Sequence, residues 1–127
     1  MRLVIGGYAQ GKLDYVLQRY YLRDDMVWEG SLPADKTGQA DTIVINHLHN
    51  WVKQRILDGA CPEEEILSFV EQFNDCIVIS DEIGNGIVPV DPIEREYRER
   101  MGRILIQLAD RAEGVERVIC GIGQTIK

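Results

Sequence analysis

Residues 2–12 read RLVIGGYAQGK, and this stretch decides the fold. Arg2 to Ile5 is a short β-rich run that stops at two glycines, which indicates a strand entering a tight turn. Residues 12–20 then have the pattern of a helix. The turn between them matches G-x-x-x-x-G-K, in which backbone amides surround a phosphate and the lysine neutralises its outer oxygens. The order strand, glycine loop, helix therefore predicts a phosphate-binding loop.

The last position of this motif is changed. A full motif continues with Ser or Thr, whose hydroxyl binds Mg²⁺, whereas this chain has Leu13, which carries no oxygen. We predict nucleotide binding by the loop and its flanks, that is by Gly6, Gly7, Tyr8, Ala9, Gln10, Gly11, Lys12 and Leu13. An ordinary glycine turn is the alternative, but the position directly between a strand and a helix favours a phosphate loop.

Strand and helix patterns alternate through most of the remaining chain. Apolar runs at 42–45, 76–79 and 117–122 predict further strands, and Gly114 is the expected helix C-cap before the last of them. Between them, apolar residues recur at helical spacing: Leu48, Trp51, Val52 and Ile56; Ile66, Leu67, Val70 and Phe73 after Pro62; and Ile93, Tyr97, Met101, Ile104, Leu105 and Leu108 after Asp91-Pro92. Residues 21–40 are mostly loop, with a possible short strand at 26–28.

This alternation predicts an α/β protein in which helices cover both faces of a mainly parallel sheet. Together with the glycine loop, it indicates a three-layer α/β/α P-loop nucleotide-binding fold. The length of 127 residues suits a single domain, and 45% hydrophobic residues suffice for one core. We therefore expect one nucleotide-binding domain over residues 1–127.

The composition and charge of the chain restrict the classes of molecule that it can bind. A net charge of -7 and a pI near 4.8 argue against binding of DNA or RNA through a broad basic surface. No apolar run approaches the roughly 20 residues of a membrane span, and the first strand leads directly into the glycine turn, so we expect a cytoplasmic protein without membrane contact. The three cysteines lack metal-site spacing and are expected to be reduced and buried: Cys61, Cys76 and Cys120.

Two carboxylates follow the strand at 76–79. Asp81 and Glu82 precede a Gly84-Asn85-Gly86 turn, at the carboxyl end of a strand, which is where ligands bind in open α/β sheets. We predict that both act in catalysis with Lys12 and steer a weakly held Mg²⁺. The alternative is that they only close a turn.

The segment from Ile79 to Pro89, ISDEIGNGIVP, resembles the S-N-E-V-G-x-G-I-V-P segment of the adenosylcobinamide kinase/adenosylcobinamide-phosphate guanylyltransferase family. Residues 94–102 match the arginine-rich helix of that family, and residues 121–127 match its closing G-x-P-x-x-x-K except at the proline. Upstream, the glycine loop is similar to the family's G-G-x-x-S-G-K-S. Leu48 and Trp51 agree with its D-C-L-T-L-W segment, where Asn46 replaces the acid.

This resemblance implies a P-loop fold, GTP or ATP in the loop, a corrinoid substrate nearby and a homo-oligomer. The implied reaction is phosphorylation of the aminopropanol hydroxyl of adenosylcobinamide. The family's H-R-x-x-R-P segment, which carries the guanylylated histidine, has no counterpart between Tyr21 and Asp41, so guanylyl transfer is not expected. Leu13 and Asn46 remove the two usual protein oxygens for Mg²⁺, and the alternative function is an inactive nucleotide- or corrinoid-binding assembly subunit.

Two further groups of residues have competing interpretations. Arg95 and Arg98 are candidates for contact with phosphate or corrinoid, although alternating Arg and Glu residues on this helix are typical of a solvated, ion-paired face. His47 and His49 could share a metal ion only from an extended segment, because residues two apart on a helix point in nearly opposite directions. Polar groups at a helix start are the favoured interpretation for both.

Overall fold

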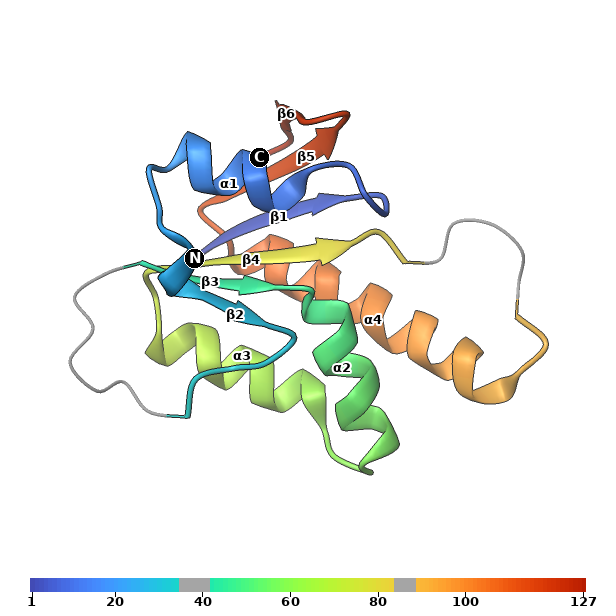
Figure 1. Cartoon of the computed structure of the whole chain (residues 1–127). Coiled ribbons are helices and arrows are strands. Elements are labelled where there is room, and N and C mark those ends of the chain that lie inside the picture. Colours follow the sequence, from blue (N-terminus) through green and yellow to red (C-terminus); the bar gives the residue numbers. More distant parts are fainter. Residues whose placement is uncertain (35–41, 84–88) are drawn as a thin grey trace.

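The computed structural model describes residues 1–34, 42–83 and 89–127. Within these ranges, six strands form one sheet in the order β2-β3-β4-β1-β5-β6 (Figure 1). The strands are β1 (Arg2–Gly6), β2 (Val27–Glu29), β3 (Ile43–Asn46), β4 (Cys76–Asp81), β5 (Gly114–Ile119) and β6 (Ile122–Thr125). The helices are α1 (Lys12–Arg19), α2 (Leu48–Leu57), α3 (Pro62–Gln72) and α4 (Pro92–Arg111), with a short 3₁₀ turn, η1 (Asp24–Met26), before β2.

The pairing of the strands confirms the mainly parallel sheet. Strand β1 lies between β4 and β5, and β3 lies between β2 and β4, all in parallel. Among the strands of the described ranges, only β6 runs antiparallel, paired with β5. The carboxyl ends of β2, β3, β4 and β1 therefore meet at one edge of the sheet.

Alternation along the central strands divides the interior into two cores. Leu3, Ile45 and Val78 belong to the larger core, which includes residues of α2, α3 and α4, whereas Val4 and Ile79 belong to the smaller core under α1. Successive side chains of a strand point to opposite faces, so an unbroken apolar run fills both cores. The helices accordingly cover both faces of the sheet, as the alternation of the sequence predicts.

The register of the parallel strand pairs places residues that are distant in sequence at the same edge of the sheet. Gly6 at the end of β1 lies opposite Asp81 at the end of β4, and Glu29 at the end of β2 lies opposite Asn46 at the end of β3. Parallel pairing aligns strand ends that leave the sheet in the same direction. The glycine loop, the predicted acid and the polar residues of β2 and β3 thus share one edge.

The C-terminal part differs from the sequence-based expectation. Gly114 is not the C-cap of α4, because Ala112 occupies that position and Gly114 is the first residue of β5. The strand expected at 117–122 is also interrupted: Cys120 and Gly121 both have positive φ and turn the chain back into β6. One apolar run therefore supplies a hairpin, since a tight turn with positive φ divides it.

Three predictions of burial were wrong. Ile93, expected in the buried stripe of α4, is half exposed, because the first turn of this helix extends past the sheet (Figure 1). Cys61 and Cys120 are exposed, and only Cys76 is buried, where burial raises the pKa of its thiol to about 11. None of the helices in the described ranges combines the length and apolar character needed to cross a membrane. The expected Gly84–Gly86 turn lies outside the described residues.

Candidate functional site

The glycine loop connects β1 to α1 and needs glycine at two positions. A Cβ on Gly6 would lie 2.6 Å from the carbonyl oxygen of Val118, so only glycine permits the close approach of β5 at this point. Gly11 precedes α1 with φ 82°, a left-handed conformation that glycine adopts without strain. The two glycines that begin and end the predicted motif are thus fixed by backbone geometry.

Gln10 holds the loop against the β5–β6 turn. Its side-chain Oε1 accepts a hydrogen bond from the amide of Cys120 at 2.8 Å, and its carbonyl accepts one from the amide of Gly121, also at 2.8 Å. On the other side, the carbonyl of Gly6 accepts a hydrogen bond from the amide of Glu82 at 2.8 Å. The loop is therefore supported by β4 and by the hairpin, although its tip at Tyr8 is exposed.

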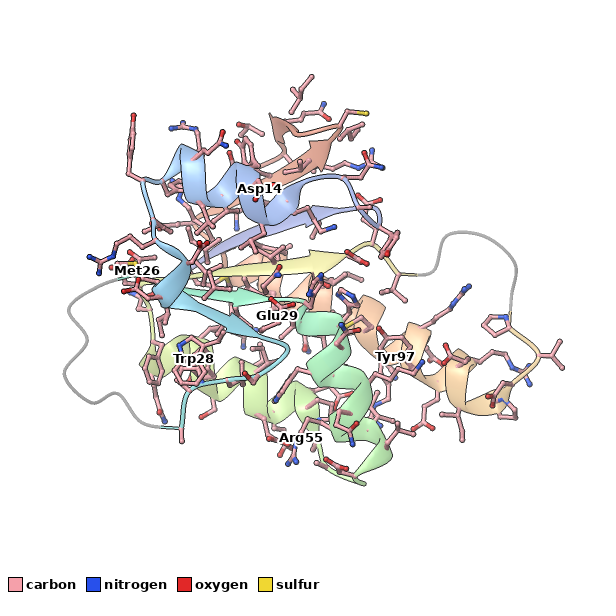
Figure 2. The ribbon with its side chains drawn as sticks, viewed as in Figure 1. Asp14, Met26, Trp28, Glu29, Arg55 and Tyr97 are labelled. Atoms are coloured by element: carbon pink, nitrogen blue, oxygen red, sulfur yellow. The ribbon has the colours of Figure 1, made fainter. Side chains whose placement is uncertain are left out.

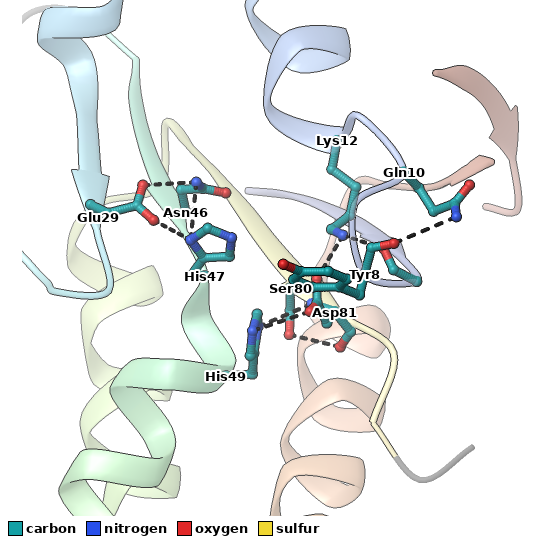
Figure 3. Close-up of polar contacts among 10 residues, drawn as sticks. Tyr8, Gln10, Lys12, Glu29, Asn46, His47, His49, Ser80 and Asp81 are labelled. Atoms are coloured by element: carbon teal, nitrogen blue, oxygen red, sulfur yellow. Dashed lines mark hydrogen bonds and ion pairs between the residues drawn. The ribbon is translucent and has the colours of Figure 1, made fainter. Parts of the chain in front are cut away.

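Lys12 is buried at the start of α1, with only 6% of its surface exposed. Its ammonium Nζ lies 2.6 Å from Oδ1 of Asp81 and donates a hydrogen bond of 2.7 Å to the carbonyl of Gly7 (Figure 3). A buried ammonium requires a counter-charge and hydrogen-bond acceptors. The structure thus brings together Lys12 and Asp81, two residues that the sequence predicts for the site.

His49, in the first turn of α2, fixes the other side of Asp81. The amide of Asp81 donates to Nδ1 of His49 at 3.1 Å, so this nitrogen carries no proton and the proton of the neutral ring is on Nε2. Nε2 in turn lies 3.3 Å from Oδ2 of Asp81. Burial lowers the pKa of His49, and the neighbouring Asp81 carboxylate offsets only part of this effect. His49 is therefore a neutral, oriented support for Asp81.

Tyr97 of α4 supports the backbone of His49. Its hydroxyl donates a hydrogen bond of 3.2 Å to the backbone carbonyl of His49, and the ring is buried. Burial raises the pKa of Tyr97 to about 12, so the hydroxyl keeps its proton and remains a donor. Figure 2 places Tyr97 on the part of α4 that faces α2. Helix α4 thus positions the first turn of α2 and, through it, Asp81.

Glu82 is directed away from Asp81. Its carboxylate forms a two-point contact with the guanidinium of Arg117 on β5, at 2.6 and 3.1 Å. Neighbouring residues at the end of a strand point to opposite sides, so Asp81 and Glu82 do not act on the same group. The predicted acidic pair is therefore divided between two ion pairs.

A second polar cluster lies at the ends of β2 and β3. The carboxylate of Glu29 accepts a hydrogen bond of 2.8 Å from Nδ2 of the buried Asn46 and contacts Nδ1 of His47 through its other oxygen. Burial alone would raise the pKa of Glu29, but the hydrogen bonds from Asn46 and His47 outweigh it and the pKa lies below its ordinary value. Glu29 is thus ionised and fixes the ring of His47.

A pocket of about 420 Å³ lies between these two clusters. Its lining combines the loop with residues of β3 and β4: Tyr8, Ala9, Gln10, Gly11, Lys12, Leu13, Asp14, Asn46, His47 and Asp81. Another pocket, of about 520 Å³, lies on the other side of α1 and shares Gly11 and Asp14 with the first. The loop pocket is the candidate site, since it contains most of the predicted nucleotide-binding residues.

Other predicted residues are not part of the lining of this pocket. Arg95 is exposed, and its guanidinium donates at 3.5 Å to the carbonyl of Val90. Arg98 is partly buried on the same helix. Further along α4, Arg100 pairs with Glu63 and Glu96, and this contact lowers the pKa of Glu63 to about 2. The alternating charges of α4 therefore include the ion pairs that their spacing suggests.

Sequence reasoning missed the roles of His49 and Glu29. No local pattern indicates them, because their partners are distant along the chain: Glu29 meets Asn46 through strand pairing, and His49 meets Asp81 across two elements. The available signal was positional, since both residues lie at carboxyl ends of strands or just beyond them. The T-shaped contact of the two histidine rings, with centroids 5.4 Å apart, places His47 and His49 between the two clusters.

Comparisons with known proteins identify relatives of this chain. A family model described as "Cobinamide kinase / cobinamide phosphate guanyltransferase" matches residues 24–126, a range that begins after the glycine loop. The chain is 37% identical over 67 residues to the bifunctional adenosylcobalamin biosynthesis protein CobU of Escherichia coli, covering 50% of this chain and 37% of that protein. It is 39% identical over 51 residues to the Salmonella typhimurium protein of the same name, covering 40% of this chain and 28% of that protein.

The matched segments thus span well under half of these curated relatives. The family match, by contrast, extends over most of the present chain and includes the strand ends that carry Glu29, Asn46 and Asp81. The loop at residues 6–12 lies outside the match, so its interpretation depends on its motif and geometry. The chain belongs to the cobinamide kinase / cobinamide phosphate guanyltransferase family.

Proposed function

We propose that this chain, acting as a single domain over residues 1–127, binds GTP or ATP in the loop pocket and transfers the terminal phosphoryl group to the aminopropanol hydroxyl of adenosylcobinamide. The observation that carries the proposal is the buried ammonium of Lys12 in the 420 Å³ pocket, at the junction of a glycine loop and a helix. A cation beside backbone amides at a helix N-terminus is a binding site for phosphate. Family membership supplies the corrinoid as the acceptor class.

Binding of a triphosphate changes the partners of Lys12. In the free protein, Asp81 and the carbonyl of Gly7 satisfy its ammonium. A phosphate oxygen competes for the same ammonium and brings more negative charge than a carbonyl oxygen. Asp81 remains fixed by His49, so it limits the movement of Lys12 and selects ligands that carry enough charge to compete.

The described residues do not offer a set of oxygens for direct coordination of Mg²⁺. Asp81 is occupied by Lys12 and His49, Glu82 contacts Arg117, and the amide of Asn46 donates to Glu29. Among the residues that the structure describes, no three potential ligands gather in one place. We therefore assign no step to a protein-bound metal ion. Mg²⁺ is expected to arrive on the nucleotide, retaining water molecules as it often does.

The remaining assignments follow from the same proposal. Tyr8 to Leu13 contact the nucleotide, and Arg95 and Arg98 of α4 are the assigned contacts to a larger acceptor or to a second copy in a homo-oligomer. Guanylyl transfer is not part of the proposal, because the histidine motif of the family is absent from the sequence. We place the protein in the cytoplasm, without nucleic acid or membrane as a partner.

Titration with a fluorescent GTP or ATP analogue, followed by product analysis with adenosylcobinamide, tests this function. Lys12→Ala is expected to weaken nucleotide binding by at least about tenfold, because it removes a charge-assisted contact. Arg103→Gln, on the solvent face of α4, is the matched control for loss of one positive charge. Equal binding by the Lys12→Ala variant and the wild type would contradict the proposed site.

A second candidate is a nucleotide-binding or assembly subunit without turnover. Two observations favour it: the close pairing of Lys12 with Asp81 and the apolar Leu13 at the position of the motif hydroxyl. Both candidates predict nucleotide binding that depends on Lys12. Formation of phosphorylated adenosylcobinamide by the wild type separates them, since only the kinase produces it.

A further inference from the structure

His47 stands out among the groups that line the loop pocket. The ammonium of Lys12 and the carboxylate of Asp81 neutralise each other at 2.6 Å, and the amide of Asn46 is engaged by Glu29. His47 uses Nδ1, which contacts Glu29 and lies 3.4 Å from Nδ2 of Asn46, and its side chain is 40% exposed. Within the described ranges, its Nε2 has no protein partner.

The partner of His47 determines which nitrogen is basic. The Asn46 amide donates to Glu29 at 2.8 Å and lies farther from Nδ1 than Glu29 does. An ionised carboxylate only accepts hydrogen bonds, so Nδ1 carries the proton that faces Glu29. In the neutral ring, the lone pair is therefore on Nε2. Figure 3 shows Nδ1 directed at Glu29 and the opposite side of the ring directed away from Glu29, toward Lys12 and Tyr8. These two residues line the same pocket as His47.

The backbone holds this ring in an unusual position. His47 has φ 55° and ψ 50°, a left-handed conformation that is uncommon for residues other than glycine. It directly precedes α2 and follows the buried Asn46, so both neighbours are fixed. Sparsely populated backbone conformations persist where the surrounding structure enforces them, often at functional sites.

From this geometry we infer that His47 is the general base of the proposed transfer and that Glu29 is its positioning residue. Nε2 accepts the proton of the acceptor hydroxyl while the hydroxyl oxygen bonds to the terminal phosphorus of the nucleoside triphosphate. The bond from that phosphorus to the bridging oxygen breaks, and the nucleoside diphosphate leaves. The imidazolium that forms is stabilised by Glu29 and then returns its proton to water.

Several charged groups surround the two residues and contribute to the pH response. Glu29 comes from β2, Lys12 and Asp14 from α1, His49 from α2 and Asp81 from β4. Lys12 and Asp81 compensate each other, and His49 is neutral, so Glu29 is the uncompensated charge in direct contact with His47. The inference rests on the proposed kinase function, and its tests are chosen to separate the two.

The first test reports on structure and does not depend on activity. The chain has two histidines, so a long-range ¹H–¹⁵N spectrum of protein labelled at histidine resolves both rings. We expect opposite tautomers at neutral pH, with the proton on Nδ1 in His47 and on Nε2 in His49. The variants His47→Asn and Glu29→Gln assign the signals. A proton on Nε2 of His47 in the neutral ring would overturn the inference.

The second test measures turnover with GTP or ATP and adenosylcobinamide across pH. His47→Asn keeps the left-handed backbone, which asparagine tolerates, and is expected to reduce kcat by about 100-fold, with little change in nucleotide binding. The acidic limb that a histidine base is expected to give the wild-type kcat profile should disappear in this variant. Glu29→Gln should cause a smaller loss and move that limb, because the ring loses its charged partner.

The outcomes distinguish the two ideas. Turnover by His47→Asn with the rate and pH profile of the wild type overturns the role of His47 and leaves the kinase proposal intact. Wild-type protein that binds nucleotide and never forms product overturns both. Arg103→Gln, whose side chain lies on the outer face of α4, is expected to retain the wild-type profile.

Discussion

The two sides of the loop pocket use the same residue types for different purposes. On the β4 side, Lys12 and His49 are buried, the side chain of Asp81 is 14% exposed, and the three residues satisfy one another. On the β2–β3 side, Glu29 and His47 are partly exposed, and only Asn46 is buried. His47 and His49 are two residues apart, yet one is held by a carboxylate and the other by a backbone amide. The partner of Nδ1, and not the sequence neighbourhood, decides which nitrogen of each ring is available.

The two sides of the pocket differ in what their charge pairs contribute to stability and to reactivity. A buried charge pair is costly to disrupt, because removal of one partner leaves the other without compensation. A partly exposed carboxylate–histidine pair contributes little to stability but leaves one ring nitrogen open to a ligand. We therefore expect substitutions on the β4 side to affect folding as well as nucleotide binding, and those on the β2–β3 side to affect mainly the chemistry.

The largest effect is expected from Asp81→Ala. The ammonium of Lys12, which is 6% exposed, would lose its carboxylate, and the free energy of unfolding should fall by about 3 kcal/mol. Urea denaturation monitored by circular dichroism measures this loss. The double variant Lys12→Met/Asp81→Ala is the control and should be more stable than Asp81→Ala. A double variant that is less stable than Asp81→Ala would show that the pair is not the cause.

A charge introduced on the β2–β3 side should lower the free energy of unfolding by an intermediate amount. Asn46→Asp keeps the shape of the side chain but replaces the donor to Glu29 with a second carboxylate, at a cost of about 1–2 kcal/mol at neutral pH. Repulsion raises the folded-state pKa of one of the two acids. The loss of stability should therefore diminish as pH falls toward 4 and that acid takes up a proton. Denaturation at pH 7 and pH 4 measures the change, and an unchanged difference would contradict it.

Loss of the Tyr97 hydroxyl should have a smaller effect. Tyr97→Phe removes the hydrogen bond to the carbonyl of His49 and should cost about 1 kcal/mol, because a buried carbonyl loses a donor. Tyr21→Phe is a matched control, since Tyr21 is almost fully exposed and its hydroxyl should contribute nothing measurable. Thermal or urea unfolding of the two variants gives the comparison. Equal stability of both variants would indicate that α4 does not support α2 in this way.

The smallest change in the free energy of unfolding is expected from loss of the Glu29 charge. Hydrogen bonds from Asn46 and His47 lower its folded-state pKa, so its stabilisation is present above the ordinary pKa of a glutamate and is lost as pH falls through the lowered value. The side chain is 59% exposed, and solvent screening limits the contribution to less than about 1 kcal/mol. Glu29→Gln should flatten this acidic dependence, whereas Glu64→Gln on the exposed face of α3 should not.

Much of the fold was predictable because its signals are local. The apolar runs at β3 and β4, the proline at the start of α3 and the Asp91-Pro92 start of α4 were all recognisable in the sequence. The hairpin of β5 and β6 was not, because its turn at Cys120–Gly121 interrupts an apolar pattern that continues through it. Of the candidate site, Lys12 and Asp81 meet as expected, while Glu82 turns to Arg117.

The sequence alone indicated the alternation of strands and helices up to α4, the glycine loop between β1 and α1 and the presence of polar residues at several strand ends. These features depend on side-chain periodicity and on glycine conformation, which act over a few residues. Only the tertiary structure decided that Asp81 pairs with Lys12 and that Glu29 pairs with His47. Those contacts depend on strand register and on which side of a strand end each residue points to, and both are set by pairing between distant segments.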